Sequence, residues 1–213
     1  MSKQTPIYEK YQELLSLHGH PRKIWPQWCG VAKNERTRQI IALGAILTQR
    51  TSWTNAEQAL MNLKEADLLS IKKVAETDLD RLTELVRVAG FYTTKPKRLQ
   101  ALCRFILDNY GTVSDMQKSD LGDLREELLE VYGIGPETAD ALLLYALDKP
   151  SFVIDAYANR FVEKYGLATT DDYHELKDVF ESSLPTDVEI YQNYHVLIIV
   201  DQKGIDKSGM EVV

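Results

Sequence analysis

The sequence predicts an all-α protein. Apolar residues recur three and four positions apart along almost the whole chain, a spacing typical of amphipathic helices. The single extended candidate, residues 152–154, is too short and isolated to form a sheet. The 213 residues are 44% hydrophobic and 27% charged, which is typical of a folded chain with a substantial core.

The apolar stripes define the elements in chain order. They predict helices over residues 7–15, 40–47, 56–63, 79–86, 99–109, 121–129 and 139–146. Thr77 and Asp80 resemble a capping box in front of the fourth of these helices. Further helices are expected over residues 156–165, about 171–183 and about 188–200. No Gly-, Ser- or Pro-rich linker divides the chain, and no internal repeat is visible.

A glycine-rich turn separates two of the predicted helices. Gly133, Ile134 and Gly135 interrupt the apolar stripes, and Pro136 stands where the next helix begins. Glycine reaches backbone angles closed to other residues, so the N–H groups of this turn could approach a phosphate oxygen. The pattern predicts a hairpin between helices, which is either an anion site or an ordinary connection.

Asp155 follows the hairpin by about one helix length. It stands between the apolar residues 152–154 and the helix expected from Ala156. An aspartate at that position is ordinarily the N-cap of the helix. The helix dipole would also keep its carboxylate ionised, as acid–base or electrostatic chemistry requires.

The overall charge argues against binding of nucleic acid through bulk electrostatics. The formal net charge is −7 and the pI is about 5.2, so any affinity for phosphates must come from local contacts. Two small basic groups are present: Lys95, Lys97 and Arg98, and Lys33, Arg36 and Arg38. Both are interpreted as solvated helix starts, with placed phosphate contacts as the alternative.

Other polar and aromatic residues give weaker signals. The four histidines, His18, His20, His174 and His195, show no metal-ligand spacing and are interpreted as surface or packing residues. Cys29 and Cys103 are isolated, and we expect reduced thiols that are buried or semi-buried. Trp25, Pro26 and Trp53 stand among polar residues, either as core between lobes or as an aromatic pocket.

These motifs together resemble the helix-hairpin-helix, Gly/Pro-Asp superfamily of DNA base-excision glycosylases. The resemblance covers about residues 37–166 and includes the segments LGAILTQRTSW and GFYTTKPKRL. The positions that fit the family pattern are Leu129, Gly133, Ile134, Gly135, Thr138, Ala139, Val153, Asp155 and Arg160.

The resemblance implies two lobes and a role for several residues. A central barrel would span residues 35–148, and residues 1–34 with 149–213 would form the second lobe. Asp155 would stabilise an oxocarbenium-like sugar or orient a water molecule. The hairpin with Glu137, Thr138 and Arg160 would contact DNA, and Gln49 would fill the gap left by a flipped nucleotide.

The resemblance also implies the type of reaction. Relatives that cut the DNA backbone carry a lysine where this chain has Glu137, and a carboxylate cannot form a Schiff base. The chain is therefore expected to be a monofunctional glycosylase. Trp25, Pro26 and Trp53 are expected to stack on a cationic alkylated purine, as in the small 3-methyladenine DNA glycosylase branch. Lys203 occupies a position near the end of the last helix that faces the base pocket in that branch.

Cofactors and partners complete these expectations. No cysteine follows Cys103, so the four-cysteine iron–sulfur cluster of many relatives is not expected, and no metal site is predicted. The family hairpin can hold a monovalent cation through backbone carbonyls. We expect a monomer in the cytoplasm or nucleoid that binds damaged double-stranded DNA and no membrane. The alternatives are an endonuclease III-like glycosylase and lyase for oxidised pyrimidines, and a helix-hairpin-helix DNA-binding module without catalysis.

Overall fold

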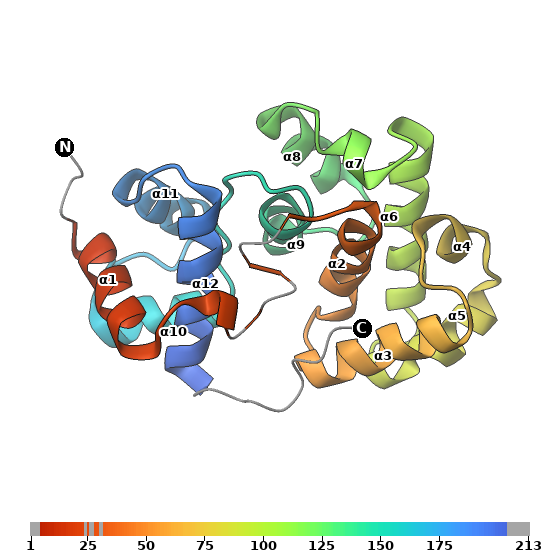
Figure 1. The fold of residues 1–213 in the computed structure, drawn as a ribbon, viewed down its shortest axis with the longest axis horizontal. Helices are drawn as coiled ribbons and strands as arrows, with labels where there is room; N and C mark the ends of the chain where they lie inside the picture. The colour runs from red at the N-terminus through yellow and green to blue at the C-terminus, as the bar shows by residue number, and fades with distance from the viewer. Residues whose placement is uncertain (1–4, 24, 26–27, 30–31, 204–213) are drawn as a thin grey trace. The chain divides into compact units, whose positions relative to one another are not determined.

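The computed structural model describes residues 5–23, 25, 28–29 and 32–203. Within them every regular element is a helix, so the predicted all-α class is confirmed (Figure 1). None of the helices in this part of the chain is long and apolar enough to cross a bilayer. The described residues divide into two compact units: unit 1 holds those up to Ala32 and from Asp148 to Lys203, and unit 2 holds Lys33–Leu147.

Unit 2 is built around α2. Its residues 41–47 are all buried, which is typical of a helix that is apolar on every side. Helices α3, α6, α7 and α9 pack against it, and Figure 1 draws α2 between α9 and α6. The elements of this unit are α2 (Glu35–Leu47), α3 (Trp53–Glu65), α4 (Ile71–Glu76), α5 (Leu79–Val86), η2 (Arg87–Ala89), α6 (Lys95–Asn109), α7 (Val113–Met116), α8 (Leu121–Glu130), α9 (Pro136–Ala141) and a π-helical turn (Leu142–Ala146).

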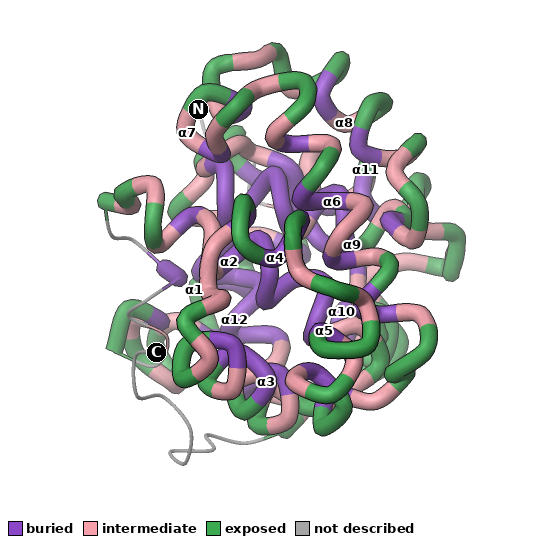
Figure 2. Tube along the Cα trace, turned by 90° about the vertical axis from the view of Figure 1, so that its right-hand side faces the viewer, coloured by how far each residue is buried: buried purple, intermediate pink, exposed green. Residues whose placement is uncertain are grey.

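Unit 1 is organised around α12. This helix packs against α1, α10 and the 3₁₀ turn η1, and Figure 2 marks much of it as buried. Its buried stretch contains polar side chains as well as apolar ones: Gln192, Asn193 and His195 are each no more than 6% exposed. The elements of this unit are α1 (Pro6–His18), η1 (Pro21–Lys23), α10 (Ala156–Tyr165), α11 (Tyr173–Ser183) and α12 (Val188–Lys203).

The helix ends differ from the sequence prediction in two places. The N-cap of α5 is Asp78, whose side chain accepts hydrogen bonds from the N–H groups of Asp80 and Arg81. The capping box expected from Thr77 was therefore wrong: the hydroxyl of Thr77 donates instead to the carbonyl of Lys73 at the end of α4. After α9 the α-helix also widens into a π-helical turn, which periodicity does not predict.

Glu35 joins the start of α2 to the short helix α7. Its carboxylate accepts hydrogen bonds from the N–H groups of Val113 (3.1 Å) and Ser114 (2.8 Å) and from the amide of Gln39 (2.7 Å). Partial burial raises the pKa of Glu35, but the hydrogen bonds from Ser114, Gln39 and Val113 outweigh it and hold the pKa below its ordinary value. The carboxylate thus caps a helix to which it does not belong.

Replacing Glu35 with glutamine should destabilise unit 2. The glutamine amide keeps one acceptor oxygen, but its NH2 group faces N–H donors that it cannot accept from. We therefore expect the free energy of unfolding to fall by about 1–2 kcal/mol at neutral pH. Because the pKa of Glu35 is lowered by folding, its contribution is present above the ordinary glutamate pKa and fades as the pH falls through the folded value. Urea unfolding at pH 7 and at pH 3 measures this.

Glu9→Gln is the matched control, because Glu9 is an exposed acid in the first turn of α1. A difference between Glu35→Gln and the native chain that stays constant from pH 7 to pH 3 would contradict the capping role.

Candidate functional site

The segment that leads to Asp155 is held rigidly within unit 1. Residues 151–154 are all buried. Lys177 of α11 donates to the hydroxyl of Ser151 (2.8 Å) and pairs with Glu181, and Glu181 accepts a hydrogen bond from the N–H of Phe152 (2.7 Å). The ring of Phe152 stacks on Phe180 at 4.4 Å. The backbone therefore reaches α10 in a fixed position.

Asp155 is the N-cap of α10, as its sequence position predicts. Its Oδ1 accepts hydrogen bonds from the N–H groups of Tyr157 (2.9 Å) and Ala158 (2.8 Å). The other carboxylate oxygen, Oδ2, takes no part in the cap. Only 15% of the side chain is exposed, so the carboxylate sits at the positive end of a helix and largely out of water.

His195 of α12 faces this carboxylate. Its Nε2 lies 3.5 Å from Oδ2 of Asp155, and its side chain is 8% exposed. Burial alone would raise the pKa of Asp155, but His195 and the two helix N–H groups lower it below its ordinary value. Asp155 is thus ionised at neutral pH, and the interpretation of His195 as a plain surface or packing residue was incomplete.

Two cations flank Tyr157, two residues after Asp155. The guanidinium of Arg160 lies 4.6 Å from the centre of the Tyr157 ring, and Nζ of Lys203 lies 4.8 Å from it. Both cationic side chains are exposed. Unit 1 therefore carries two exposed cations over the ring of Tyr157, two residues after Asp155.

The predicted aromatic residues belong to different units. Trp25 and Trp28 of unit 1 pack together with ring centres 6.2 Å apart. Trp53 is the first residue of α3 in unit 2 and is half-buried. Pro26 lies outside the described residues. Neither Trp25 nor Trp53 is a fully buried core residue, so both keep surface for contact with a ligand.

The hairpin in unit 2 has the predicted turn geometry. Gly133 has a φ of +83°, a conformation that only glycine adopts without strain. Ile134 is 5% exposed and anchors the turn, while Gly135 precedes α9 without a side chain over the helix end. Because Gly135 has no Cβ, no side chain at this position covers the first N–H groups of α9.

Gln49 is bound to this hairpin. Its amide nitrogen donates to the carbonyl of Gly133 and to the hydroxyl of Thr138, each at 3.0 Å. Its amide oxygen accepts from the Arg98 guanidinium at 2.7 Å. Arg50, the next residue, has a φ of +51°. The structure thus brings Gln49, Thr138 and the hairpin together, and it adds Arg98 to them.

Glu137 is an exposed carboxylate in the first turn of α9. That position suits a negative charge, because the helix dipole is positive there. The hairpin carbonyls of Val131 and Gly133 each accept one hydrogen bond. A carbonyl has a second lone pair, and the binding of a monovalent cation at this turn stays a prediction.

The interpretation of the two basic groups as solvated helix starts was partly wrong. Lys95 is fully buried, and its Nζ donates to the carbonyls of Leu47 (2.7 Å) and Ala89 (2.6 Å). Burial, with a smaller effect of Arg98, lowers the pKa of Lys95 to about 8. Arg38 is also buried and donates to the carbonyl of Ala146. Lys97 and Arg36 are exposed, as predicted.

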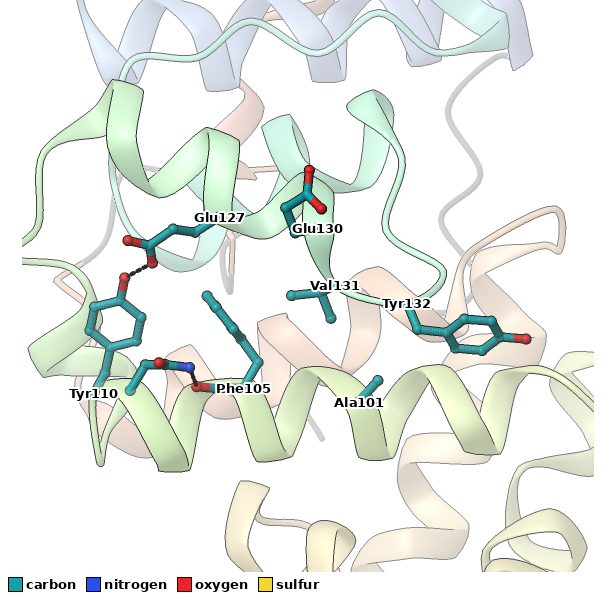
Figure 3. Close-up of a pocket in the computed structure, with 8 residues that line it drawn as sticks. Ala101, Phe105, Tyr110, Glu127, Glu130, Val131 and Tyr132 are labelled. Carbon is teal, nitrogen blue, oxygen red and sulfur yellow. Dashed lines mark hydrogen bonds between the residues drawn. The ribbon is translucent and has the colours of Figure 1, made fainter.

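A pocket of about 610 Å³ lies between α6 and the end of α8 (Figure 3). Tyr110 and Glu127 are hydrogen-bonded at one end, and burial together with Glu127 raises the pKa of Tyr110 to about 12. None of the residues predicted from the sequence lines it. Its lining residues are Ala101, Phe105, Asn109, Tyr110, Glu127, Glu130, Val131 and Tyr132.

The described residues contain no group of three or more His, Cys, Asp or Glu side chains that could hold a metal ion. Cys29 and Cys103 are buried, and burial raises the pKa of the Cys103 thiol well above its usual range. A thiol held neutral in this way is a poor nucleophile and a poor ligand.

Comparisons with known proteins agree with this geometry. Residues 43–186 match the family described as "HhH-GPD superfamily base excision DNA repair protein". The chain is 47% identical over 196 residues to the "Putative DNA repair glycosylase MJ1434" of Methanocaldococcus jannaschii, covering 91% of this chain and 85% of that protein.

Two further relatives differ in their described activity. The crystal structure of the H. pylori 3-methyladenine DNA glycosylase MagIII bound to 1,N6-ethenoadenine has a TM-score of 0.79 and 30% identity, and the match covers 94% of this chain and 99% of that one. Endonuclease III of Thermotoga maritima is 26% identical over 148 residues, covering 70% of this chain and 66% of that protein.

Gly133→Ala should be costly, whereas Gly135→Ala should not. A Cβ at Gly133 would lie 2.3 Å from Cγ of Arg98 on a backbone with positive φ, but nothing lies within 4 Å of a Cβ at Gly135. We expect Gly133→Ala to lose about 1–2 kcal/mol of unfolding free energy and Gly135→Ala to stay within about 0.5 kcal/mol of the native value. Chemical denaturation of the two variants measures the difference, and equal losses would contradict it.

Proposed function

The chain belongs to the HhH-GPD superfamily of base excision DNA repair proteins, and we propose that it is a monofunctional DNA glycosylase that removes alkylated purines. A DNA glycosylase of base excision repair is the activity that the family and the relatives support. The observation that carries the mechanism is the carboxylate of Asp155, which is largely buried, is ionised and has one oxygen outside the helix cap.

Asp155 acts on the sugar of the damaged nucleotide. As the N-glycosidic bond breaks, its electron pair leaves with the base nitrogen and positive charge develops on the deoxyribose. The ionised carboxylate stabilises that charge and orients a water molecule toward the anomeric carbon. The water adds to that carbon and loses a proton, so the products are a free base and an abasic site.

Glu137 determines which nucleophile attacks the sugar. In relatives with lyase activity a lysine occupies this position and attacks the sugar. A carboxylate forms no imine with an aldehyde carbon, so this chain uses water as its nucleophile. The similarity to endonuclease III supports a second candidate, a glycosylase with lyase activity on oxidised pyrimidines. Glu137 is the feature that favours the first candidate.

The substrate class rests on two lines of support. The 3-methyladenine DNA glycosylase of H. pylori is 30% identical and matches 94% of this chain. Trp25 and Trp53 are each partly exposed, and indole faces attract the positive charge that alkylation places on a purine. Such a base departs readily because its charge is neutralised as it leaves.

The DNA partner is bound by few groups. The hairpin amides, Gln49, Arg98 and the exposed Arg160 and Lys203 contact the duplex, while the net charge of −7 gives no general attraction. Each neutralised phosphate adds about one unit to the slope of log affinity against log salt. A modest slope is therefore consistent with specific binding here.

Asp155→Asn should abolish excision and leave the fold intact. Asparagine is as good an N-cap as aspartate, but its side chain carries no charge for the sugar. We expect the single-turnover rate of base release from alkylated duplex DNA to fall about 10²-fold or more, with duplex affinity retained. Asp172→Asn, at the exposed cap of α11, is the matched control and should release bases at the native rate.

Native excision by the Asp155→Asn variant would refute the proposed mechanism. If the native chain releases no base from methylated DNA but releases oxidised pyrimidines, the substrate class is wrong and the second candidate gains.

Borohydride should trap no covalent adduct between this chain and its substrate. Reduction traps only a Schiff base, and the proposed reaction passes through none. Gel analysis of enzyme, alkylated DNA and sodium borohydride measures this, with an endonuclease III and its own substrate as the positive control. An adduct formed at the rate of base release would instead support the lyase.

A further inference from the structure

We infer that His195 is the positioning residue for the catalytic carboxylate: its imidazole holds Oδ2 of Asp155 while the start of α10 holds Oδ1. The inference rests on the proposed function of Asp155 and assigns a role to a residue outside the family match, which ends at residue 186. It also explains why the buried stretch of α12 contains a histidine, which packing alone does not require.

The first support is the geometry of the contact. Helices α10 and α12 pack against each other, and Nε2 of His195 comes within 3.5 Å of Oδ2. This distance is long for a hydrogen bond, and catalytic hydrogen bonds commonly shorten only when substrate is bound. The two side chains are 8% and 15% exposed, so the contact lies mostly outside bulk water.

The second support is a count of lone pairs. An ionised carboxylate has about four positions at which it accepts hydrogen bonds. Tyr157 and Ala158 use the two on Oδ1. His195 takes one on Oδ2 when its Nε2 carries the proton, which leaves one position on the same oxygen. That remaining position is the one available to a water molecule or to the charge on the sugar.

The third support comes from three other aspartate caps in the described part of the chain. Asp78, Asp120 and Asp172 each accept two backbone N–H groups at a helix start, as Asp155 does. All three are exposed, and the cap is a sufficient explanation for them. Asp155 differs because it is largely buried and faces an imidazole from another helix. Helix capping therefore does not account for His195.

The function of this arrangement is to fix the direction of the reactive oxygen. A cap holds one carboxylate oxygen, but the side chain can still tilt about that point. A donor on the second oxygen removes the tilt, and misplacement of a catalytic group by 1 Å can cost about 10²-fold in rate. His195 acts through Asp155 and does not itself touch the reacting atoms.

The test compares His195→Leu, His195→Gln and His174→Leu. Leucine fills similar space without a donor, whereas glutamine keeps an N–H donor. His174 is an exposed histidine on α11 in the same unit and serves as the control. We expect His195→Leu to lower the single-turnover rate of base release about 10²-fold while duplex affinity stays native, His195→Gln to recover most of the rate, and His174→Leu to change nothing.

A double-mutant comparison separates positioning from a general structural effect. If His195 acts through Asp155, His195→Leu causes no further loss in the Asp155→Asn background. Nitrogen-detected NMR of the native chain gives a readout that is independent of activity: Nε2 of His195 should carry a proton, and its signal should shift in Asp155→Asn. An unprotonated Nε2 would overturn the inference even if the leucine variant does not fold.

The outcomes distinguish this inference from the function on which it rests. If Asp155→Asn abolishes excision and His195→Leu does not slow it, the positioning role fails and the proposed function stands. Losses for leucine and glutamine that are equal, or that add to the Asp155→Asn loss, also overturn it. If Asp155→Asn excises normally, both fail.

Discussion

The capping interaction at the start of α10 is the constraint on which the site depends. It sets one oxygen of Asp155 against two backbone N–H groups and leaves the other oxygen outside the cap, where the proposed reaction needs it. The cap also keeps the carboxylate charged in a place that water hardly reaches, because helix N–H groups and His195 replace the lost hydration. The clamp made by Lys177 and Glu181 fixes the residues that precede it. The hydrogen bonds that stabilise the start of α10 are therefore the same ones on which the proposed reaction depends.

The chain uses several of its positive charges inside its units. Lys95 and Arg38 donate to carbonyls at or near helix ends, where the main chain lacks its own donors. These cations stabilise unit 2 and are not available to phosphates. Glu137 at the hairpin is exposed as well. The proposed contact with DNA therefore rests on backbone amides and a few exposed cations, and bulk charge would contribute little to it.

Two independent constraints require glycine at position 133. The turn needs a positive φ, and the Arg98 side chain occupies the space where a Cβ would lie. Arg98 in turn holds the oxygen of Gln49, whose nitrogen binds the carbonyl of the same glycine. The hairpin, the turn after α2 and the start of α6 are therefore one hydrogen-bonded cluster. A substitution at any of these residues therefore disturbs the hydrogen bonds of the others.

The sequence predicts what is local and misses what packing creates. The long helices, the hairpin and the cap at Asp155 follow from periodicity, glycine spacing and the residue before a helix. The short helices α4 and α7 lack enough turns to show a period. Thr77 and Asp78 are both residue types that cap helices, so the sequence does not decide which of them is the N-cap of α5. His195 gave no signal, since nothing near it in the chain resembles a motif and its partner lies on another helix. The polar residues in the buried stretch of α12 were the available clue. A histidine whose helical neighbours are mostly apolar must find a polar partner when its helix is buried, and the carboxylate at the start of the adjacent helix is that partner.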